Sequence, residues 1–391
     1  MRVLFATTAN LGHVRPMIPL ARACVDSGVE VLVACPASFA DRVTAAGYAA
    51  FPFDEPSPEE VAAARARVGP NVSRHDSNVA MIRDVFGRLR GNAALARMQE
   101  AVDTWHPDLI VREPAEVASL VVAESRGVPH VQSSIGILET LRLLLGMIGQ
   151  SFPDFEEPAG LEPGTLLAAA SAAPLYTIVP PGFDDDVPGP GEPRAIHRFR
   201  YVPEPEGGAT ALPPWGDADA PLVYVTFGTV TATSPSAGAY RDVLDALSRS
   251  YARVLLATGP DGDPDSVRPW PRNARVERVP PPAVMREARA VVTHGGFGTT
   301  MTAIASGAPQ VVIPQFANDQ WINAMRVQAR GVGKALIAEP PPWELLARTV
   351  TDVLEDRSSA DAAADLQSQQ ATLPPPAAMV MRLQEDARAH V

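Results

Sequence analysis

Short apolar runs alternate with amphipathic helical segments along most of this chain, and this alternation restricts the fold more than any other feature of the sequence. Apolar runs over residues 2–6 and 29–34 are each followed by a helical pattern, over residues 16–27 and 38–46. Strands separated by helices at this spacing form parallel βαβ units with right-handed crossovers. The beginning of the chain is therefore predicted to be a doubly wound α/β domain.

The alternation continues, stops once and then starts again. A run over residues 109–111, a helical pattern over 115–126 and a run over 128–131 extend the first domain. Residues 180–221 then contain repeated Pro and Gly clusters, typical of a linker or interdomain wrap, in which only residues 199–202 have strand character. New apolar runs follow at residues 222–227, 253–257, 290–293 and 311–313, which predict a second α/β domain.

These changes divide the chain into four predicted segments. We expect a first domain over residues 1–205, a linker over 206–217, a second domain over 218–373 and a C-terminal helical segment over 374–391. The apolar positions of that helix, Met379, Val380, Leu383 and Ala387, need a surface to cover. Open α/β sheets bind ligands at the carboxyl ends of their strands, so two such domains facing across a cleft would build a bipartite site.

Length, charge and cysteine content exclude several classes of protein. The 391 residues allow two or three domains with large cores. The net charge of −12 repels phosphate backbones and anionic membranes, so we expect neither nucleic-acid binding nor stable membrane association. Cys24 and Cys35 are too few for a disulfide framework and are expected to be buried thiols. No signal peptide pattern or long apolar run is visible, which predicts a cytoplasmic protein.

The strongest motif lies in the second domain, where Thr293-His294-Gly295-Gly296-Phe297-Gly298-Thr299-Thr300 connects an expected strand to an expected helix. Glycines allow a ligand to approach the backbone, and free N–H groups at a helix start favour phosphate. The motif lacks the Gly-Lys-Ser/Thr ending of a P-loop. Two interpretations remain open, an anion cradle or a tight turn without a ligand.

Polar residues also follow the next strand. Asp319 and Gln320 stand where a helix is expected to begin, and their side chains suit the hydroxyl groups of a sugar. The alternative for Asp319 is a helix cap. A polyhydroxylated ligand beside a phosphate is the functional interpretation.

The loop after the first strand has no Gly-x-Gly-x-x-Gly, which disfavours a nicotinamide-dependent oxidoreductase. It does contain Gly12-His13-x-x-Pro16, which places His13 at the carboxyl end of a strand as a candidate general base. A general base needs a carboxylate partner, and Glu113 follows the strand over 109–111 at the same sheet edge. The alternatives are a structural histidine and a solvated or helix-starting glutamate.

No metal site is predicted. Asp184-Asp185-Asp186 lies among Pro and Gly residues and not after a sheet strand, so we interpret it as a solvated turn. The remaining histidines form no pairs at the spacing of metal ligands.

Six segments of the chain, taken together and in their order along it, resemble the sequence motifs of a known family. They are Gly12-His13-Val14-Arg15-Pro16, Pro107-Asp108-Leu109-Ile110-Val111, Leu212-Pro213-Pro214-Trp215, Val223-Tyr224-Val225-Thr226-Phe227-Gly228-Thr229, the segment from His294 to Thr299, and Asp319-Gln320 with Asn323-Ala324. Over nearly its whole length the chain is similar to GT-B fold glycosyltransferases of glycosyltransferase family 1, especially bacterial enzymes that attach sugars to macrolides, enediynes and other polyketides.

The resemblance implies an α/β fold of two Rossmann-like doubly wound domains facing across a cleft, with a C-terminal helix that crosses back to the first domain. It implies inverting, metal-independent transfer of a deoxysugar from a nucleoside-diphosphate sugar, with dTDP expected, to a hydroxyl of a hydrophobic aglycone. His13 would deprotonate that hydroxyl, and Glu113 would be its partner where the family usually has Asp. No cofactor is implied beyond the nucleotide-sugar co-substrate, and a homodimer stays open.

The resemblance also assigns the donor site. The diphosphate would be held by His294, Gly296, Gly298 and Thr299, with Gly228 and Thr229 approaching the phosphates or sugar. Sugar hydroxyls would be bound by Asp319 and Gln320, and the nucleobase by the backbone around Val279. In the first domain, residues 78–105 and 141–148 either line the aglycone pocket or form helical core.

Three other functions compete with this one. The first is a non-catalytic accessory protein that only binds a nucleotide. The second and third, on the same scaffold, are a nucleotide-sugar epimerase and a lipid glycosyltransferase, the latter disfavoured because no amphipathic membrane face is apparent.

Overall fold

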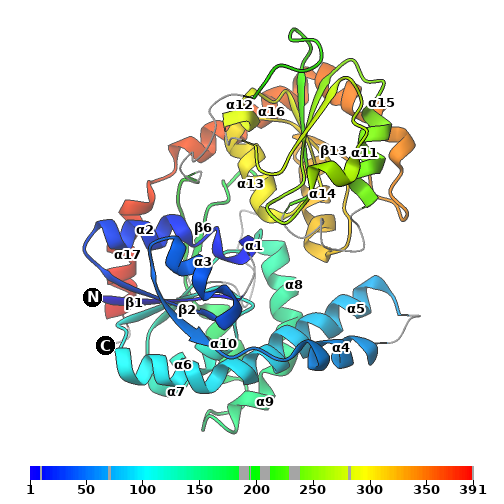
Figure 1. Cartoon of the computed structure of the whole chain (residues 1–391). Coiled ribbons are helices and arrows are strands. Elements are labelled where there is room, and N and C mark those ends of the chain that lie inside the picture. Colours follow the sequence, from blue (N-terminus) through cyan, green and yellow to red (C-terminus); the bar gives the residue numbers. More distant parts are fainter. Residues whose placement is uncertain are drawn as a thin grey trace. The chain divides into compact units, whose positions relative to one another are not determined.

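Two parallel β-sheets organise the chain, one in each of two structural units (Figure 1). The structure is a computed structural model that describes residues 1–8, 11–68, 72–184, 193, 195–202, 212–228, 238–280 and 283–389. The first unit comprises Met1–Ile178, Asp185–Arg200 and Pro374–Val391, and the second comprises Val179–Asp184 and Tyr201–Leu373. The predicted doubly wound α/β class is confirmed.

The first sheet has seven strands in the order β3-β2-β1-β4-β5-β6-β7, all paired in parallel. Its strands are β1 (Arg2–Ala6), β2 (Glu30–Pro36), β3 (Ala49–Phe53), β4 (Leu109–Arg112), β5 (His130–Ser133), β6 (Leu175–Thr177) and β7 (Ile196–Arg198). The four residues of β4 are all buried, as expected for a strand covered on both faces. The strand character expected at residues 199–202 is displaced, because β7 ends at Arg198.

Helices connect and cover these strands. They are α1 (Leu11–Val14), α2 (Ile18–Asp26), η1 (Ala37–Phe39), α3 (Ala40–Ala45), α4 (Pro58–Ala66), α5 (Arg74–Ala80), the π-helix η2 (Met81–Arg90), α6 (Gly91–Trp105), α7 (Ala118–Arg126), α8 (Leu138–Ile148), η3 (Gly149–Ser151), α9 (Pro153–Glu156) and α10 (Thr165–Ala172). Apolar side chains of α6 and α7, including Met98 and Val122, pack against Leu4 and Ile110 of the sheet.

The second sheet has six parallel strands in the order β10-β9-β8-β11-β12-β13. Its strands are β8 (Leu222–Thr226), β9 (Arg253–Ala257), β10 (Ala274–Glu277), β11 (Ala290–Thr293), β12 (Gln310–Val312) and β13 (Gly333–Ala335). Its helices are α11 (Ala239–Leu247), η6 (Pro264–Val267), α12 (Ala283–Glu287), α13 (Phe297–Ser306), α14 (Asn318–Ala329), α15 (Trp343–Glu355) and α16 (Arg357–Thr372). Buried side chains of α11 and α15 pack on the strands.

The last helix, α17 (Pro376–Arg388), belongs to the first unit and contacts α2, beside which it lies in Figure 1. Its buried residues are Pro376, Met379, Val380 and Leu383. The phenol of Tyr176, on β6, donates a hydrogen bond to Asp386 of this helix over 2.7 Å. Three of the four apolar positions singled out in the sequence are therefore buried in the first unit.

Candidate functional site

In each sheet the strand order reverses beside the first strand of the unit. β1 lies between β2 and β4, and β8 lies between β9 and β11. At such a switch point the loops leave in opposite directions and open a crevice at the carboxyl ends of the strands, where α/β proteins bind ligands. The sequence-predicted residues fall at both switch points, and each group is described within its own unit.

The switch point of the first unit brings His13 and Glu113 together. The register pairs Ala6 with Arg112, so the residues after β1 and β4 leave the sheet side by side. His13 is carried by the short helix α1, and its Nδ1 lies 3.0 Å from Oε1 of Glu113. Because Nδ1 faces a carboxylate, it carries the proton of the neutral ring, which leaves Nε2 as the proton acceptor.

The partner carboxylate, Glu113, is fully buried, and the loops after β1 and β4 both hold it in place. Its Oε1 accepts the N–H of Thr8 at 3.2 Å, and its Oε2 accepts the N–H of Ala115 at 2.6 Å. Burial alone would raise the pKa of Glu113, but the charge of His13 and these hydrogen bonds outweigh it and lower the pKa. The buried Arg112 supports the loop after β4 by donating to the Glu116 carbonyl at 3.1 Å. An ionised Glu113 is therefore built into this unit.

Two neighbours of His13 were not singled out in the sequence. Thr8 places its Oγ1 3.2 Å from the His13 Nδ1, in addition to its backbone bond to Glu113. Phe86 of η2 lies nearly parallel to the His13 ring, with the centroids 6.2 Å apart and an interplanar angle of 15°. Thr8 is the second residue of the loop that carries His13, so its position in the sequence could have indicated that it lies near His13. Phe86 is distant in the sequence, and nothing in the sequence indicates that it lies near His13.

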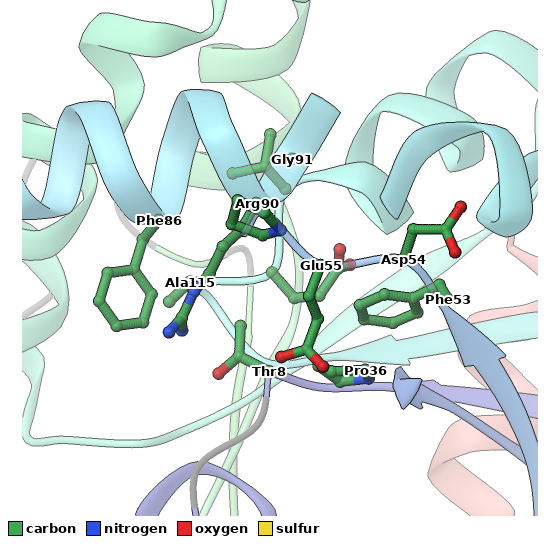
Figure 2. Close-up of a pocket in the computed structure, with 12 residues that line it drawn as sticks. Thr8, Pro36, Phe53, Asp54, Glu55, Phe86, Arg90, Gly91 and Ala115 are labelled. Atoms are coloured by element: carbon green, nitrogen blue, oxygen red, sulfur yellow. The ribbon is translucent and has the colours of Figure 1, made fainter. Parts of the chain in front are cut away.

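A pocket of about 300 Å³, a volume that includes space open to solvent, lies next to Thr8 and Phe86 (Figure 2). Both Thr8 and Phe86 line it, as do Arg90 and Gly91 at the end of η2. The remaining lining residues are Pro36, Phe53, Asp54, Glu55, Pro56, Ala115, Glu116 and Val117. The helical region over 78–105 thus contributes to a pocket, whereas in the region over 141–148 the side chains of Leu144, Met147 and Ile148 are buried.

The switch point of the second unit is built around His294. Its ring fills the space that two glycines leave free: a Cβ at Gly228 would lie 2.8 Å from the ring, and one at Gly296 would also collide with it. Burial lowers the pKa of His294 to about 4, and a hydrogen bond with the Thr226 backbone opposes this shift only in part. The His294 imidazole is therefore uncharged at pH 7. It can donate a hydrogen bond without carrying a charge, or it can simply fill space between the two glycines.

The helix start after His294 has the geometry of an anion cradle. Gly296 is the N-cap of α13, so the N–H groups of the first helical turn have no acceptor within the helix. Gly298 and Thr299 of this turn are partly exposed. Outside its own helical turn, a Cβ at Gly298 would meet no atom of the described residues within 4 Å, in contrast to Gly228 and Gly296. The space beside Gly298 is therefore not filled by any described residue.

The loop after β12 packs behind this turn. The amide of Asn323, fully buried, donates to the Gly295 carbonyl over 2.7 Å. Gln320 is also buried, and its Oε1 accepts the N–H groups of Gln315 and Phe316 at 2.8 and 3.1 Å. Its carbonyl oxygen is thus committed to the loop, and only its NH₂ group stays available to a sugar. Asp319 is not the N-cap of α14, which is Ala317, and lies partly exposed in the first turn.

Two further donor-site predictions concern neighbouring loops. Val279 follows β10, and its side chain is 65% exposed, which fits a segment that offers its backbone to a ligand. Thr229 lies outside the described residues.

The described residues contain no group of three or more His, Cys, Asp or Glu side chains that could hold a metal ion. The interpretation of the Asp184 segment as a solvated turn is wrong for Asp184, which is buried and whose carbonyl accepts a hydrogen bond from Arg330. The other two aspartates of that segment lie outside the described residues. Cys24 and Cys35 are free and buried, as predicted, and burial raises both thiol pKa values to about 12. None of the helices in the described ranges is long and apolar enough to cross a membrane.

Comparison with known proteins gives consistent matches over both units. Residues 22–163 match the N-terminal domain, and residues 241–385 the C-terminal domain, of the erythromycin biosynthesis protein CIII-like family. L-demethylnoviosyl transferase of Streptomyces niveus is 33% identical, over 86% of this chain and 85% of its own. Elloramycin glycosyltransferase ElmGT of Streptomyces olivaceus is 31% identical, over 98% and 97%. The glycosyltransferase SsfS6 of Streptomyces sp. SF2575, solved with thymidine diphosphate, has a TM-score of 0.73, 25% identity and coverage of 98% and 99%.

Proposed function

Because the chain belongs to the erythromycin CIII-like family of GT-B antibiotic glycosyltransferases, we propose that it transfers a deoxysugar from a dTDP-sugar to a hydroxyl of a hydrophobic aglycone, with inversion at the anomeric carbon. That it is a natural-product glycosyltransferase follows from the family itself. The donor, the stereochemistry and the residue roles are our proposal. The observation that carries it is the buried Glu113 carboxylate at 3.0 Å from His13 Nδ1.

The proposed reaction is a single displacement. The acceptor oxygen forms a bond to the anomeric carbon while His13 Nε2 takes the hydroxyl proton. The bond from the anomeric carbon to the β-phosphate oxygen breaks, and dTDP leaves with the electron pair. Glu113 stays ionised throughout and stabilises the imidazolium that forms, as a buried carboxylate does for a histidine base.

On the donor side, we propose that the diphosphate binds at the start of α13. The first-turn N–H groups, the open space beside Gly298 and the Thr299 hydroxyl support this assignment. His294, held neutral by burial, would donate a hydrogen bond without adding charge. Asp319 and the NH₂ group of Gln320 would bind sugar hydroxyls, and the backbone at Val279 the base. The thymidine diphosphate bound to SsfS6 supports the choice of dTDP.

On the acceptor side, we propose that the pocket lined by Thr8 and Phe86 receives the aglycone beside His13. Its apolar walls, including Pro36, Phe53 and Val117, suit a hydrophobic molecule. No metal or other cofactor takes part in any of these steps.

The test is to incubate the purified protein with dTDP-sugars and to follow the release of dTDP by chromatography. Slow donor hydrolysis that His13→Ala abolishes, with dTDP binding retained, supports the proposal. A non-catalytic nucleotide-binding protein would bind dTDP but release none from any donor. Retained turnover in His13→Ala would contradict the role of the base.

A further inference from the structure

Arg90 is a cation in the pocket beside His13 that the proposed reaction does not use. In the part of the chain that the structure describes, its guanidinium makes no hydrogen bond and no ion pair, and its contact is with the Phe86 ring, 4.3 Å from the centroid. The side chain is half-buried. A guanidinium has five N–H donors, and here they line a pocket without an acceptor among the described residues, so they are available to a ligand.

The helix that carries Arg90 fixes it in this place. Phe86 and Arg90 are four residues apart on the π-helix η2, a rare form that occurs often at functional sites. Glycines let this helix approach its neighbours closely: a Cβ at Gly87 would lie 2.8 Å from the Ser151 Cβ, and one at Gly91 would lie 2.8 Å from the Phe155 ring. In Figure 2 the Arg90 side chain runs beside the Phe86 ring toward Thr8.

The acidic residues around the pocket do not neutralise Arg90. Glu113 is engaged by His13, Thr8 and Ala115, and Glu116 accepts the N–H groups of Ala118 and Ser119. Glu55 accepts the N–H of Ser38, and Figure 2 places it beside Pro36, away from Phe86. Asp54 is exposed.

The balance of nearby charges keeps the guanidinium positive. Burial lowers the pKa of Arg90, and the charges of Glu55 and Glu113 partly restore it. Arg90 is therefore a charged donor with no acceptor among the described residues.

We propose that Arg90 binds a carboxylate of the acceptor molecule, so that this chain selects aglycones that carry an acidic group near the hydroxyl to be glycosylated. The inference rests on the proposed function in one respect, that the pocket beside His13 holds the acceptor. A planar carboxylate matches the two parallel donors of a guanidinium. The Phe86 ring, already in contact with Arg90, would cover one side of the bound group.

The experiment measures binding and does not depend on turnover. Two fluorescent probes are titrated at pH 8, 6-hydroxy-2-naphthoate and its methyl ester, which differ only in the acidic group. We expect wild type to bind the acid about 10- to 100-fold more tightly than the ester, the range of one charge-assisted contact. Arg90→Met should remove this preference and leave ester binding unchanged, and Arg90→Lys should keep part of it. Glu55→Gln, which removes a nearby negative charge, should strengthen acid binding.

Several outcomes overturn the proposal. Equal affinity of wild type for acid and ester would do so, as would a preference for the acid that survives in Arg90→Met. If Arg90→Met has the melting temperature of the wild type but loses affinity for the acid and the ester equally, Arg90 shapes the pocket and does not bind the carboxylate. Failure of the proposed transferase function would be a separate result. In that case neither the wild type nor any variant would release dTDP from a donor, but the preference for the acid over the ester could still be measured.

Discussion

The two histidines of the candidate site show how surroundings decide what one side chain does. His13 is 18% exposed and has a buried carboxylate 3.0 Å from its Nδ1, an arrangement that orients the ring and leaves Nε2 free to accept a proton from a substrate. His294 has no carboxylate partner among the residues that the structure describes, and it fills the space between two glycines, where burial favours the neutral ring. The sequence could place both at strand ends, but it could not show this difference, since burial depends on contacts with distant residues.

Replacing His13 with alanine is expected to lower kcat by roughly 100- to 10,000-fold, the usual contribution of a general base. The dTDP dissociation constant should not change, because the residues proposed to bind dTDP all belong to the second unit. Steady-state kinetics and calorimetric titration with dTDP measure the two effects. Glu113→Gln should also lower kcat, since it removes the charge that stabilises the imidazolium. Parallel loss of dTDP affinity and kcat in His13→Ala would refute the division of roles.

The buried His294 should make the protein less stable in mild acid. Its pKa falls from the ordinary 6.5 to about 4 on folding, so the unfolded chain binds more protons between these values. The neutral, buried His294 therefore costs no stability above pH 6.5. As the pH falls from 6.5 toward 4, the free energy of unfolding decreases by about 3 kcal/mol in all. Denaturant unfolding at several pH values measures it. His294→Gln should show a weaker dependence on pH over this window, and an unchanged slope would contradict the assignment.

At the scale of elements, the strand ends were predictable and the helix geometry was not. Parallel register places the residues after β1 and β4 side by side, as it does those after β8 and β11, so His13, Glu113, Gly228 and His294 could be assigned to two sheet edges. The region over 78–105 reads as one helix, but its segment from Met81 to Arg90 is π-helical, and Gly87 and Gly91 bring its end close to Ser151 and Phe155. Nothing in the local sequence indicates it, and the pocket with Arg90 was missed for that reason.

The glycine-rich turn offers a test between an anion cradle and a bare tight turn. A Cβ at Gly298 would not collide with any residue that the structure describes, and alanine is a better helix former than glycine by roughly 0.5–1 kcal/mol. Gly298→Ala should therefore keep or slightly raise the melting temperature. If phosphate occupies the open space, the same substitution should weaken dTDP binding, as titration would show. Unchanged dTDP affinity would favour the bare turn.

Gly228→Ala is the matched comparison. Gly228 has a φ of 76°, and its Cβ would lie 2.8 Å from His294, so this variant should lose stability as well as dTDP affinity. The two alanine variants thus separate a clash with protein atoms from a clash with the ligand.

At the scale of the whole molecule, the chain returns to its first unit after completing the second. Residues from Pro374 onward belong to the same unit as β1, and the buried side chains of α17 are part of that unit's interior. The apolar spacing of the last helix indicates that it needs a partner, but the sequence does not show which surface it covers. The contact with α2 and the Tyr176–Asp386 hydrogen bond supply that answer.

Deleting residues 374–391 should destabilise the first unit and leave the second intact. The deletion removes the buried Met379, Val380 and Leu383, each worth roughly 1.5–3 kcal/mol when fully buried. Calorimetry should show one thermal transition lowered by the deletion and another that dTDP still raises, because ligand binding stabilises the unit that holds the ligand. Met381→Ala is the control, since Met381 lies on the same helix but is 66% exposed and should change neither transition. If the deletion abolishes the dTDP-dependent transition as well, the two units do not fold independently and α17 stabilises both.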